Sequence, residues 1–250
     1  MLFELRDVAF HCEDGTPALN GIDASIAAGD RLVILGANGS GKSTLLRILA
    51  GLEFPTGGSI RWDGTDLSEK SLRDASLRTD FRTRVGFVFQ NADAQLFNAT
   101  VQEEIEFGPR QMGLREPEVR ERTTDIMRML GIQHLAERPP FRLSGGEKRK
   151  VAMASVLSMN PDVILMDEPF LGLDPRSQSW LLKTLQILSA SGKTTILATH
   201  TLDLVPQVSD RTWVLDETHH LIADAASVDV LRDLGRLRRA NLTALEEATV

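Results

Sequence analysis

The stretch GANGSGKST, residues 36–44, decides the fold. It matches the pattern G-x-x-x-x-G-K-[ST] and lies between an apolar run, RLVIL (31–35), and a helical pattern over 43–50 that Gly51 closes. In that context backbone N–H groups and a helix N-terminus converge on phosphates. We therefore expect a phosphate-binding loop rather than a chance Gly-rich turn, made of Gly36, Ala37, Asn38, Gly39, Ser40, Gly41, Lys42, Ser43 and Thr44.

Further apolar runs alternate with helical patterns on the C-terminal side of this loop. Such runs, rich in Val, Ile and Leu, are typical of strands buried on both faces, and their alternation with helices indicates a largely parallel sheet. The helical patterns cover 117–130 and 175–188, the second with Asp174 as N-cap. The expected strands are VGFVF (85–89), VILM (163–166), TTILAT (194–199) and TWVL (212–215).

The regions flanking this series have a different pattern. The opening segment LFELRDVAFHC alternates polar and apolar residues and is followed by turn signals, as expected for antiparallel strands. Residues 91–142 are helix-rich and interrupt the strands, which indicates an inserted helical subdomain at about 91–160. We expect an α/β domain over 1–225 and a short helical extension over 226–250.

Composition narrows the class of protein. The chain has 250 residues, a net charge of −7 and 42% hydrophobic residues, which fits a packed globular domain and lacks the basic excess of a general nucleic-acid binder. One cysteine excludes an internal disulfide framework. The first twenty residues show no secretory signal, and no apolar run is long enough to span a membrane.

Polar residues follow three of the expected strands. Asp167 and Glu168 end VILMDEP (163–169), and strand alternation predicts that they point to opposite sides, so that Asp167 serves Mg²⁺ and Glu168 accepts a proton from water. Gln90 and His200 end two other strands, at the sheet edge where open α/β sheets bind ligands. Each of these residues alone is more often structural; beside a phosphate loop the functional interpretation is favoured.

A second candidate anion site lies in RLSGGEKRKVA, residues 142–152. Ser144, Gly145 and Gly146 precede a helical run, and the helical insertion separates them from the phosphate loop, so a second chain is expected to use them. A simpler interpretation is that Ser144 only caps the helix. The basic residues 148–150 then form a solvated face.

Taken together, the phosphate loop, Gln90, LSGGE, ILMDEP, GLD and His200 resemble ABC-transporter ATPases in order and spacing over residues 1 to about 225. The segments VGFVFQNADAQLFNATVQEEIEFGP and LSGGEKRKVAMASVLSMNPDVILMDEP are most similar to the energy-coupling-factor type, in particular its cobalt/nickel branch. The fold implied is a P-loop α/β core with an antiparallel N-terminal subdomain and a helical insertion.

The resemblance also implies a mechanism. Two such subunits, as a homodimer or a heterodimer with a second ABC ATPase, sandwich two ATP molecules, each held between the phosphate loop of one chain and Ser144–Gly146 of the other. Lys42 then binds phosphate, Ser43, Gln90 and Asp167 hold Mg²⁺, Glu168 acts on the water, and His200 contacts the γ-phosphate; Asp174 lies in the loop that couples the sites.

Several positions depart from the family pattern. Glu147 stands where Gln is most frequent, and Phe170 replaces the usual Thr after DEP. Ala92 and Ala94 stand where the cobalt/nickel branch often has Pro and Asp. The adenine-stacking position, usually Tyr, falls at Cys12, and the chain contains no Tyr. We therefore expect weak stacking on the base.

The implied function is that of an ATP-hydrolysing subunit of a membrane importer for nickel, cobalt or a vitamin, peripheral on the cytoplasmic face of a prokaryotic membrane. We expect residues 90–108, with Leu96, Phe97, Val101 and Ile105, to receive integral membrane partners, although ordinary subdomain core is an equal alternative for any one residue. A soluble ABC ATPase acting on nucleic acid or ribosomes and a P-loop kinase are the alternative classes; acidic composition disfavours the first, and a kinase has no need of LSGGE.

Overall fold

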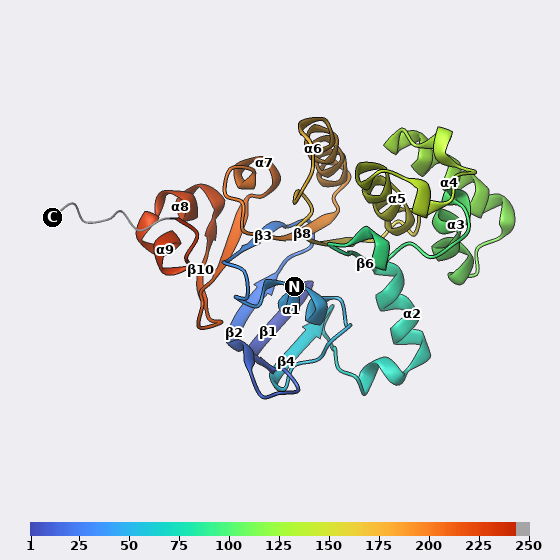
Figure 1. Cartoon of the computed structure of the whole chain (residues 1–250). Helices are drawn as coiled ribbons and strands as arrows, with labels where there is room; N and C mark the ends of the chain where they lie inside the picture. The colour runs from blue at the N-terminus through green and yellow to red at the C-terminus, as the bar shows by residue number, and fades with distance from the viewer. Residues whose placement is uncertain (244–250) are drawn as a thin grey trace.

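The computed structural model describes residues 1–243, which form two sheets with helices around them (Figure 1). An antiparallel sheet has the order β2-β1-β4-β5, and a larger sheet has the order β10-β9-β3-β8-β7-β6. The strands of the first sheet are β1 (Phe3–His11), β2 (Pro17–Ile26), β4 (Gly57–Trp62) and β5 (Thr65–Asp66). Those of the second are β3 (Arg31–Leu35), β6 (Val85–Val88), β7 (Val163–Asp167), β8 (Thr194–Thr199), β9 (Arg211–Leu215) and β10 (Leu221–Ala226).

The larger sheet is parallel from β9 to β6, and only β10 pairs antiparallel at its edge. The predicted α/β class, the antiparallel N-terminal sheet and all five predicted strands of the core sheet are confirmed. Around the sheets lie α1 (Lys42–Leu49), α2 (Ala75–Arg84), α3 (Val101–Gln111), α4 (Glu116–Leu130), α5 (Gly145–Leu157), α6 (Pro175–Ala190), α7 (Val205–Val208), α8 (Ser227–Arg232) and α9 (Leu234–Arg239), with 3-10 turns at Ser71–Arg73, Ala92–Ala94, Gln133–Leu135 and Pro140–Arg142.

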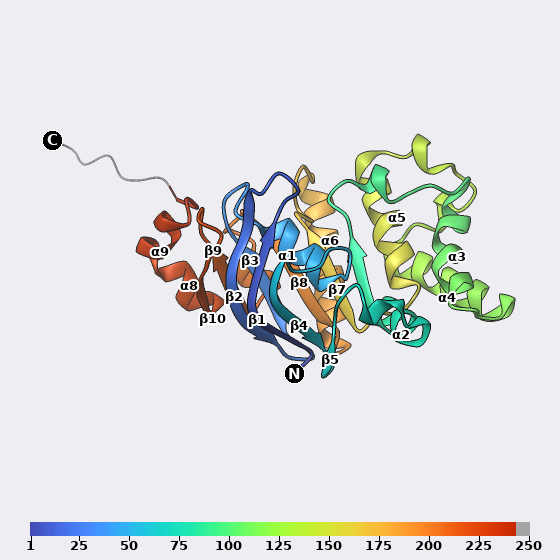
Figure 2. The same cartoon turned by 90° about the horizontal axis from the view of Figure 1, so that it is seen from below.

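Helix α1 fills the space between the two sheets, as Figure 2 shows from below. Its apolar residues Leu45, Leu46, Ile48 and Leu49 are fully buried and share one core cluster with both sheets. The antiparallel sheet therefore covers one face of the parallel sheet, with α1 as the filling layer.

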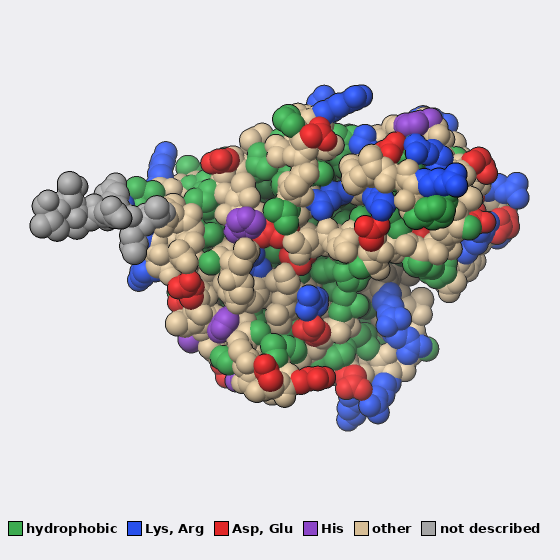
Figure 3. Space-filling view, in the orientation of Figure 1, with side chains coloured by type: hydrophobic (Ala, Val, Ile, Leu, Met, Phe, Trp, Pro, Cys, Tyr) green, Lys and Arg blue, Asp and Glu red, His purple; other side chains and the backbone are tan. Residues whose placement is uncertain are grey.

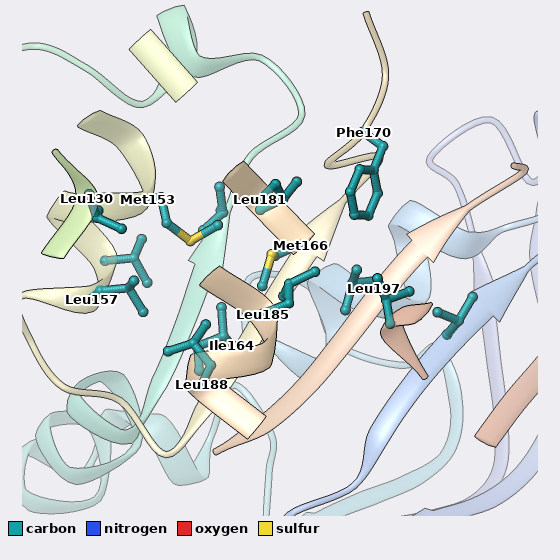
Figure 4. Close-up of a cluster of buried hydrophobic side chains, with 14 of the residues drawn as sticks. Leu130, Met153, Leu157, Ile164, Met166, Phe170, Leu181, Leu185, Leu188 and Leu197 are labelled. Atoms are coloured by element: carbon teal, nitrogen blue, oxygen red, sulfur yellow. The ribbon is translucent and has the colours of Figure 1, made fainter. Parts of the chain in front are cut away.

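The opposite face of the parallel sheet packs against α5, α6 and α7. Figure 4 shows the centre of this second cluster, where side chains of β7 and β8 meet those of α5 and α6. Burial on both faces explains why these strands read as continuous apolar runs. The labelled residues are Leu130, Met153, Leu157, Ile164, Met166, Phe170, Leu181, Leu185, Leu188 and Leu197.

The predicted helices form where their capping residues place them. Helix α4 ends at Gly131, whose φ of 67° is a left-handed C-cap, and α6 begins after Asp174, whose carboxylate accepts from the N–H groups of Arg176 and Ser177. Helices α3, α4 and α5 lie together beyond β6, at the right of Figure 1. The boundaries chosen for this helical subdomain remain a prediction.

At the other end of the sheet, α8 and α9 lie beside β10 (Figure 1). They fall in the predicted extension 226–250, of which residues 244–250 lie outside the described part of the chain. No helix within residues 1–243 is both long enough and apolar enough to cross a bilayer.

Close packing at Gly86 predicts a stability effect. A Cβ atom there would lie 2.4 Å from Val156 Cγ1 and 3.1 Å from Pro161 Cγ, so β6 approaches α5 only because residue 86 has no side chain. We expect Gly86→Ala to lower the free energy of unfolding by about 1–3 kcal/mol. Urea denaturation should measure this loss, with Gly57→Ala as control, since its Cβ would lie at an ordinary 3.4 Å from Ala9 Cβ. Equal midpoints for the two variants would contradict the packing argument.

Candidate functional site

The phosphate-loop backbone forms a nest between β3 and α1. Gly39 and Gly41 have φ of 85° and 100°, and a Cβ atom on Gly41 would lie 2.1 Å from the Ala18 carbonyl oxygen, so only glycine fits there. Lys42 is the first residue of α1. The cleft at this end has a volume of about 200 Å³ and is lined by Ala18, Asn38, Gly39, Gly41, Lys42, Ser43, Thr44, Gln90 and Glu168. The structure thus brings the loop, Gln90 and Glu168 to one cavity.

Lys42 is buried at the base of this cleft. Its Nζ donates to the carbonyl oxygens of Gly36 at 2.8 Å and Ala37 at 3.0 Å, and lies 3.9 Å from Glu168 Oε1. Burial lowers the pKa of Lys42, while the charges of Glu168 and Asp167 oppose that shift. Two carbonyl oxygens and two neighbouring carboxylates thus fix the position of the ammonium group at the base of the cleft.

Glu168 is the centre of the polar contacts. Its Oε1 lies 2.8 Å from His200 Nδ1, and its Oε2 accepts a hydrogen bond of 3.0 Å from the Thr199 hydroxyl. The strand β7 ends one residue earlier, and Glu168 has a φ of 44°. The regular strand alternation on which we based opposite sides for Asp167 and Glu168 ends at Asp167, and the charges of both carboxylates act to raise the pKa of Lys42. That the two side chains point to opposite sides and have separate roles stays a prediction.

Asp167 has the environment expected of a cation ligand. Its Oδ1 is buried without a hydrogen-bond partner. Burial raises the pKa of Asp167, and a hydrogen bond from the Ser43 side chain opposes the shift. Within residues 1–243 no group of three His, Cys, Asp or Glu side chains could hold a metal by itself. A Mg²⁺ ion held by Asp167, Ser43 and phosphate oxygens fits this donor set, because Mg²⁺ usually uses few protein ligands.

The second candidate anion site lies in another cavity. Ser144 and Gly146 line a groove of about 840 Å³ together with Asp174, and this groove contains no residue of the phosphate loop. Ser144 also caps α5 in a capping box, since its hydroxyl and backbone N–H each donate to Glu147 Oε2 at 2.8 Å. These hydrogen bonds lower the pKa of Glu147. The capping role is therefore real, and the chain's own phosphate loop does not share this site.

Arg149 is a part of the site that sequence reasoning missed. The basic run 148–150, for which a solvated face was one interpretation, makes specific contacts: Lys148 pairs with Asp93, Lys150 stacks on Trp180, and Arg149 reaches the loop after β7. Its guanidinium donates to Pro169 O at 2.6 Å and to Gln90 O at 2.9 Å. Because these partners are backbone carbonyls, no residue type in the sequence signals them.

The expected docking segment divides into core and surface. Val101 and Ile105 are fully buried and Leu96 packs against the core, so these three do not form the outer surface that we predicted. Phe97 is 66% exposed and stacks edge-to-face with Phe107, which is 41% exposed. The exposed apolar feature is thus an aromatic pair.

A buried carboxylate holds the backbone at Phe97, one member of this aromatic pair. Glu104 Oε2 accepts hydrogen bonds from the backbone N–H groups of Phe97 at 2.9 Å and Asn98 at 2.8 Å. On the face in Figure 3, basic and acidic side chains are interspersed over the helical region that carries the pair.

Two curated relatives span almost the whole chain. It is 46% identical to the nickel import ATP-binding protein NikO of Rhodobacter capsulatus, over 96% of this chain and 95% of that protein. It is 40% identical to the energy-coupling factor transporter ATP-binding protein EcfA of Methanothermobacter thermautotrophicus, over 96% and 76%. The family model described as ABC transporter matches residues 19–171.

Solved structures give the same result. CbiO1 of Clostridium perfringens, part of the ABC transporter complex cbiONQ, has a TM-score of 0.81 at 36% identity over 96% of this chain and 94% of that one. The ATP-binding cassette MJ0796, a dimer with ADP and Pi bound, has a TM-score of 0.80 at 28% identity over 90% and 98%. The predicted resemblance is therefore confirmed.

Cys12, the position where the sequence places adenine stacking, yields a prediction. Cys12 is exposed at the end of β1, and Phe10 packs against the core. We expect Cys12→Tyr to raise ATP affinity roughly two- to twelvefold and to sharpen a modest preference over GTP, because aromatic stacking contributes about 0.5–1.5 kcal/mol. Displacement of a fluorescent nucleotide would give both dissociation constants, with Cys12→Ser as control. A strong ATP preference that Cys12→Tyr leaves unchanged would mean that Phe10 or another group stacks on the base.

Proposed function

The chain belongs to the ABC transporter family of ATP-binding subunits and is an ATPase of that type, and on this premise we propose that it energises the import of a transition-metal ion, nickel or cobalt, through a membrane complex. The similarity to a nickel import subunit over nearly the full length of both chains carries the proposal. The likeness to CbiO1, part of the ABC transporter complex cbiONQ, supports a role as the ATPase subunit of a membrane transporter complex. A vitamin is the alternative cargo, as in the wider energy-coupling-factor type.

In the proposed complex the chain lies against the cytoplasmic face of the membrane, with the Phe97–Phe107 pair toward an integral subunit. Two exposed aromatic rings on an ordered backbone are suited to an apolar helix of a partner. Co-purification from detergent-solubilised membranes followed by uptake of labelled nickel and cobalt tests this role. Purification without any integral subunit would favour the alternative of a soluble ABC ATPase on nucleic acid or ribosomes.

The proposed chemistry uses positioning and charge. Lys42 and the N-terminus of α1 bind the phosphates, Glu168 accepts the proton of the attacking water, and His200 contacts the γ-phosphate. Ser43, Gln90 and Asp167 would hold Mg²⁺, which when bound neutralises charge on the phosphate oxygens. Thr199 and His200 hold the Glu168 carboxylate in place.

We further propose that each ATP lies between two chains. Ser144 and Gly145 are exposed, and their groove is separate from the phosphate-loop cleft, so they can serve a partner's nucleotide. The partner is a second copy or a related ATPase; closure then requires the γ-phosphate, and its loss reopens the pair.

Replacing the proposed base tests the chemistry. Glu168→Gln should reduce kcat by roughly 10²–10⁴-fold, because the amide keeps the shape but cannot accept a proton. ATP affinity should stay within about threefold of wild type, since the phosphate contacts remain. Steady-state assays should show almost no ATP hydrolysis, and size-exclusion chromatography with ATP should show a nucleotide-bound dimer. Near-normal turnover would remove Glu168 from the base role.

Mixed dimers test whether sites are shared between chains. Lys42→Ala disables a chain's own phosphate loop, and Ser144→Arg blocks the surface that it lends to its partner. Each homodimer should be nearly inactive, whereas the mixed dimer keeps one intact site and should recover part of the activity. Tandem purification with two tags, together with the membrane partner, would isolate the mixed species. A verified mixed dimer without recovery would count against one composite site being sufficient.

A further inference from the structure

Arg149 joins three parts of the chain through one side chain. It lies one turn into α5, which packs against β6 in Figure 1. Its Nη1 donates to the carbonyl oxygens of Glu168 at 3.4 Å, Pro169 at 2.6 Å and Leu171 at 3.3 Å. Its Nη2 donates to Gln90 O at 2.9 Å. One planar group therefore spans the backbone after β7 and the backbone after β6.

The two backbones that it joins carry the proposed catalytic pair. Glu168 has a φ of 44°, a conformation that costs a residue with a side chain about 1–3 kcal/mol unless its surroundings hold it. The Arg149 hydrogen bonds begin at this residue and extend to Pro169 and Leu171. Gln90 follows β6 and lines the phosphate-loop cleft. The Gln90 carbonyl oxygen accepts a hydrogen bond from Nη2 of the same guanidinium.

The partners of Arg149 give it a geometric role. All four hydrogen bonds go to carbonyl dipoles, and burial lowers the pKa of Arg149 without an opposing carboxylate. A guanidinium presents its donors in a fixed planar fork, whereas a lysine ammonium is a single point of charge. The contact therefore sets the distance between two loops.

Helix α5 also connects this contact to the second anion site, because it begins at Gly145, next to Ser144. A shift of α5 moves the Ser144–Gly146 surface and the Arg149 side chain together. In the proposed dimer, that surface faces the nucleotide of the other chain.

We propose that Arg149 is a positioning residue. It fixes the positions of Glu168 and Gln90 of its own chain relative to each other for hydrolysis, and it couples both positions to that of α5. This inference rests on the proposed roles of Glu168 and Gln90. Arg149 donates to backbone carbonyl oxygens, so it acts through the backbone of Glu168 and Gln90 rather than on the reacting groups.

The experiment compares three variants of the full-length chain, purified with the membrane partner. Arg149→Met removes all four hydrogen bonds; Arg149→Lys keeps the charge but cannot span both loops. Arg73→Met removes an equal charge from the 3-10 turn Ser71–Arg73, where Arg73 pairs with Glu69 and is mostly exposed. For each we would measure kcat, KM, the dissociation constant of a fluorescent ATP analogue and the thermal midpoint.

Arg149→Met and Arg149→Lys should both lower kcat roughly ten- to hundredfold, the size of effect expected when reacting groups are displaced by about 1 Å. Nucleotide affinity should change by less than about threefold, because Lys42 and the loop are untouched. Arg149→Lys should retain the thermal midpoint of wild type while kcat stays low, a separation that a purely structural role would not produce. Arg73→Met should match wild type.

Two results would overturn the inference: kcat of Arg149→Met within about twofold of wild type, or a loss of kcat that Arg149→Lys restores together with the thermal midpoint. The inference and the proposed base fail separately. If Glu168→Gln is inactive and Arg149→Met is fully active, the positioning role of Arg149 is refuted and the base role of Glu168 stands. If Glu168→Gln is active and Arg149→Met is inactive, the base role of Glu168 is refuted, and Arg149 acts as a positioning residue through Gln90.

Discussion

The burial of both faces of the parallel sheet is the constraint on which the rest of the structure depends. Alternate residues of β3 enter opposite cores: Val33 and Leu35 pack with the α6 side, and Leu32 and Ile34 with α1 and the antiparallel sheet. A sheet that is covered in this way exposes polar groups only where its strands end. The phosphate loop, Gln90 and Glu168 all follow strand ends, so packing brings residues that are far apart in sequence into one cleft. His200, at the end of β8, contacts the Glu168 carboxylate.

Charge within that cleft is balanced by neighbours rather than by water. Lys42 is buried between two carbonyl oxygens and two carboxylates, and Asp167 keeps one oxygen without a partner. Burial lowers the pKa of Lys42 and raises that of Asp167, and the opposite charges beside each group oppose those shifts. A site built in this way is organised before its ligand arrives, which reduces the reorganisation that binding requires.

Periodic patterns predicted what depends on local chemistry. The five core strands, the caps at Asp174 and Gly131, and the phosphate loop between strand and helix all follow from side-chain pattern and turn residues. Sequence reasoning failed where tertiary contacts decide: the left-handed backbone of Glu168, the Arg149 hydrogen bonds to carbonyls, and the burial of Val101 and Ile105. A carbonyl acceptor is present at every position, so its use leaves no trace in the residue types. An apolar residue on a helix looks the same whether it faces the core or a partner.

The Phe97–Phe107 pair has a consequence for how the chain behaves in the cell. Glu104 is buried and holds the backbone next to Phe97, so the rings cannot withdraw by a change of the loop without stranding a carboxylate in the core. Copies made in excess of whatever covers these rings therefore keep them in water, where exposed apolar surface promotes aggregation. In the proposed complex, matched amounts of the ATPase and its membrane subunit would keep these rings covered.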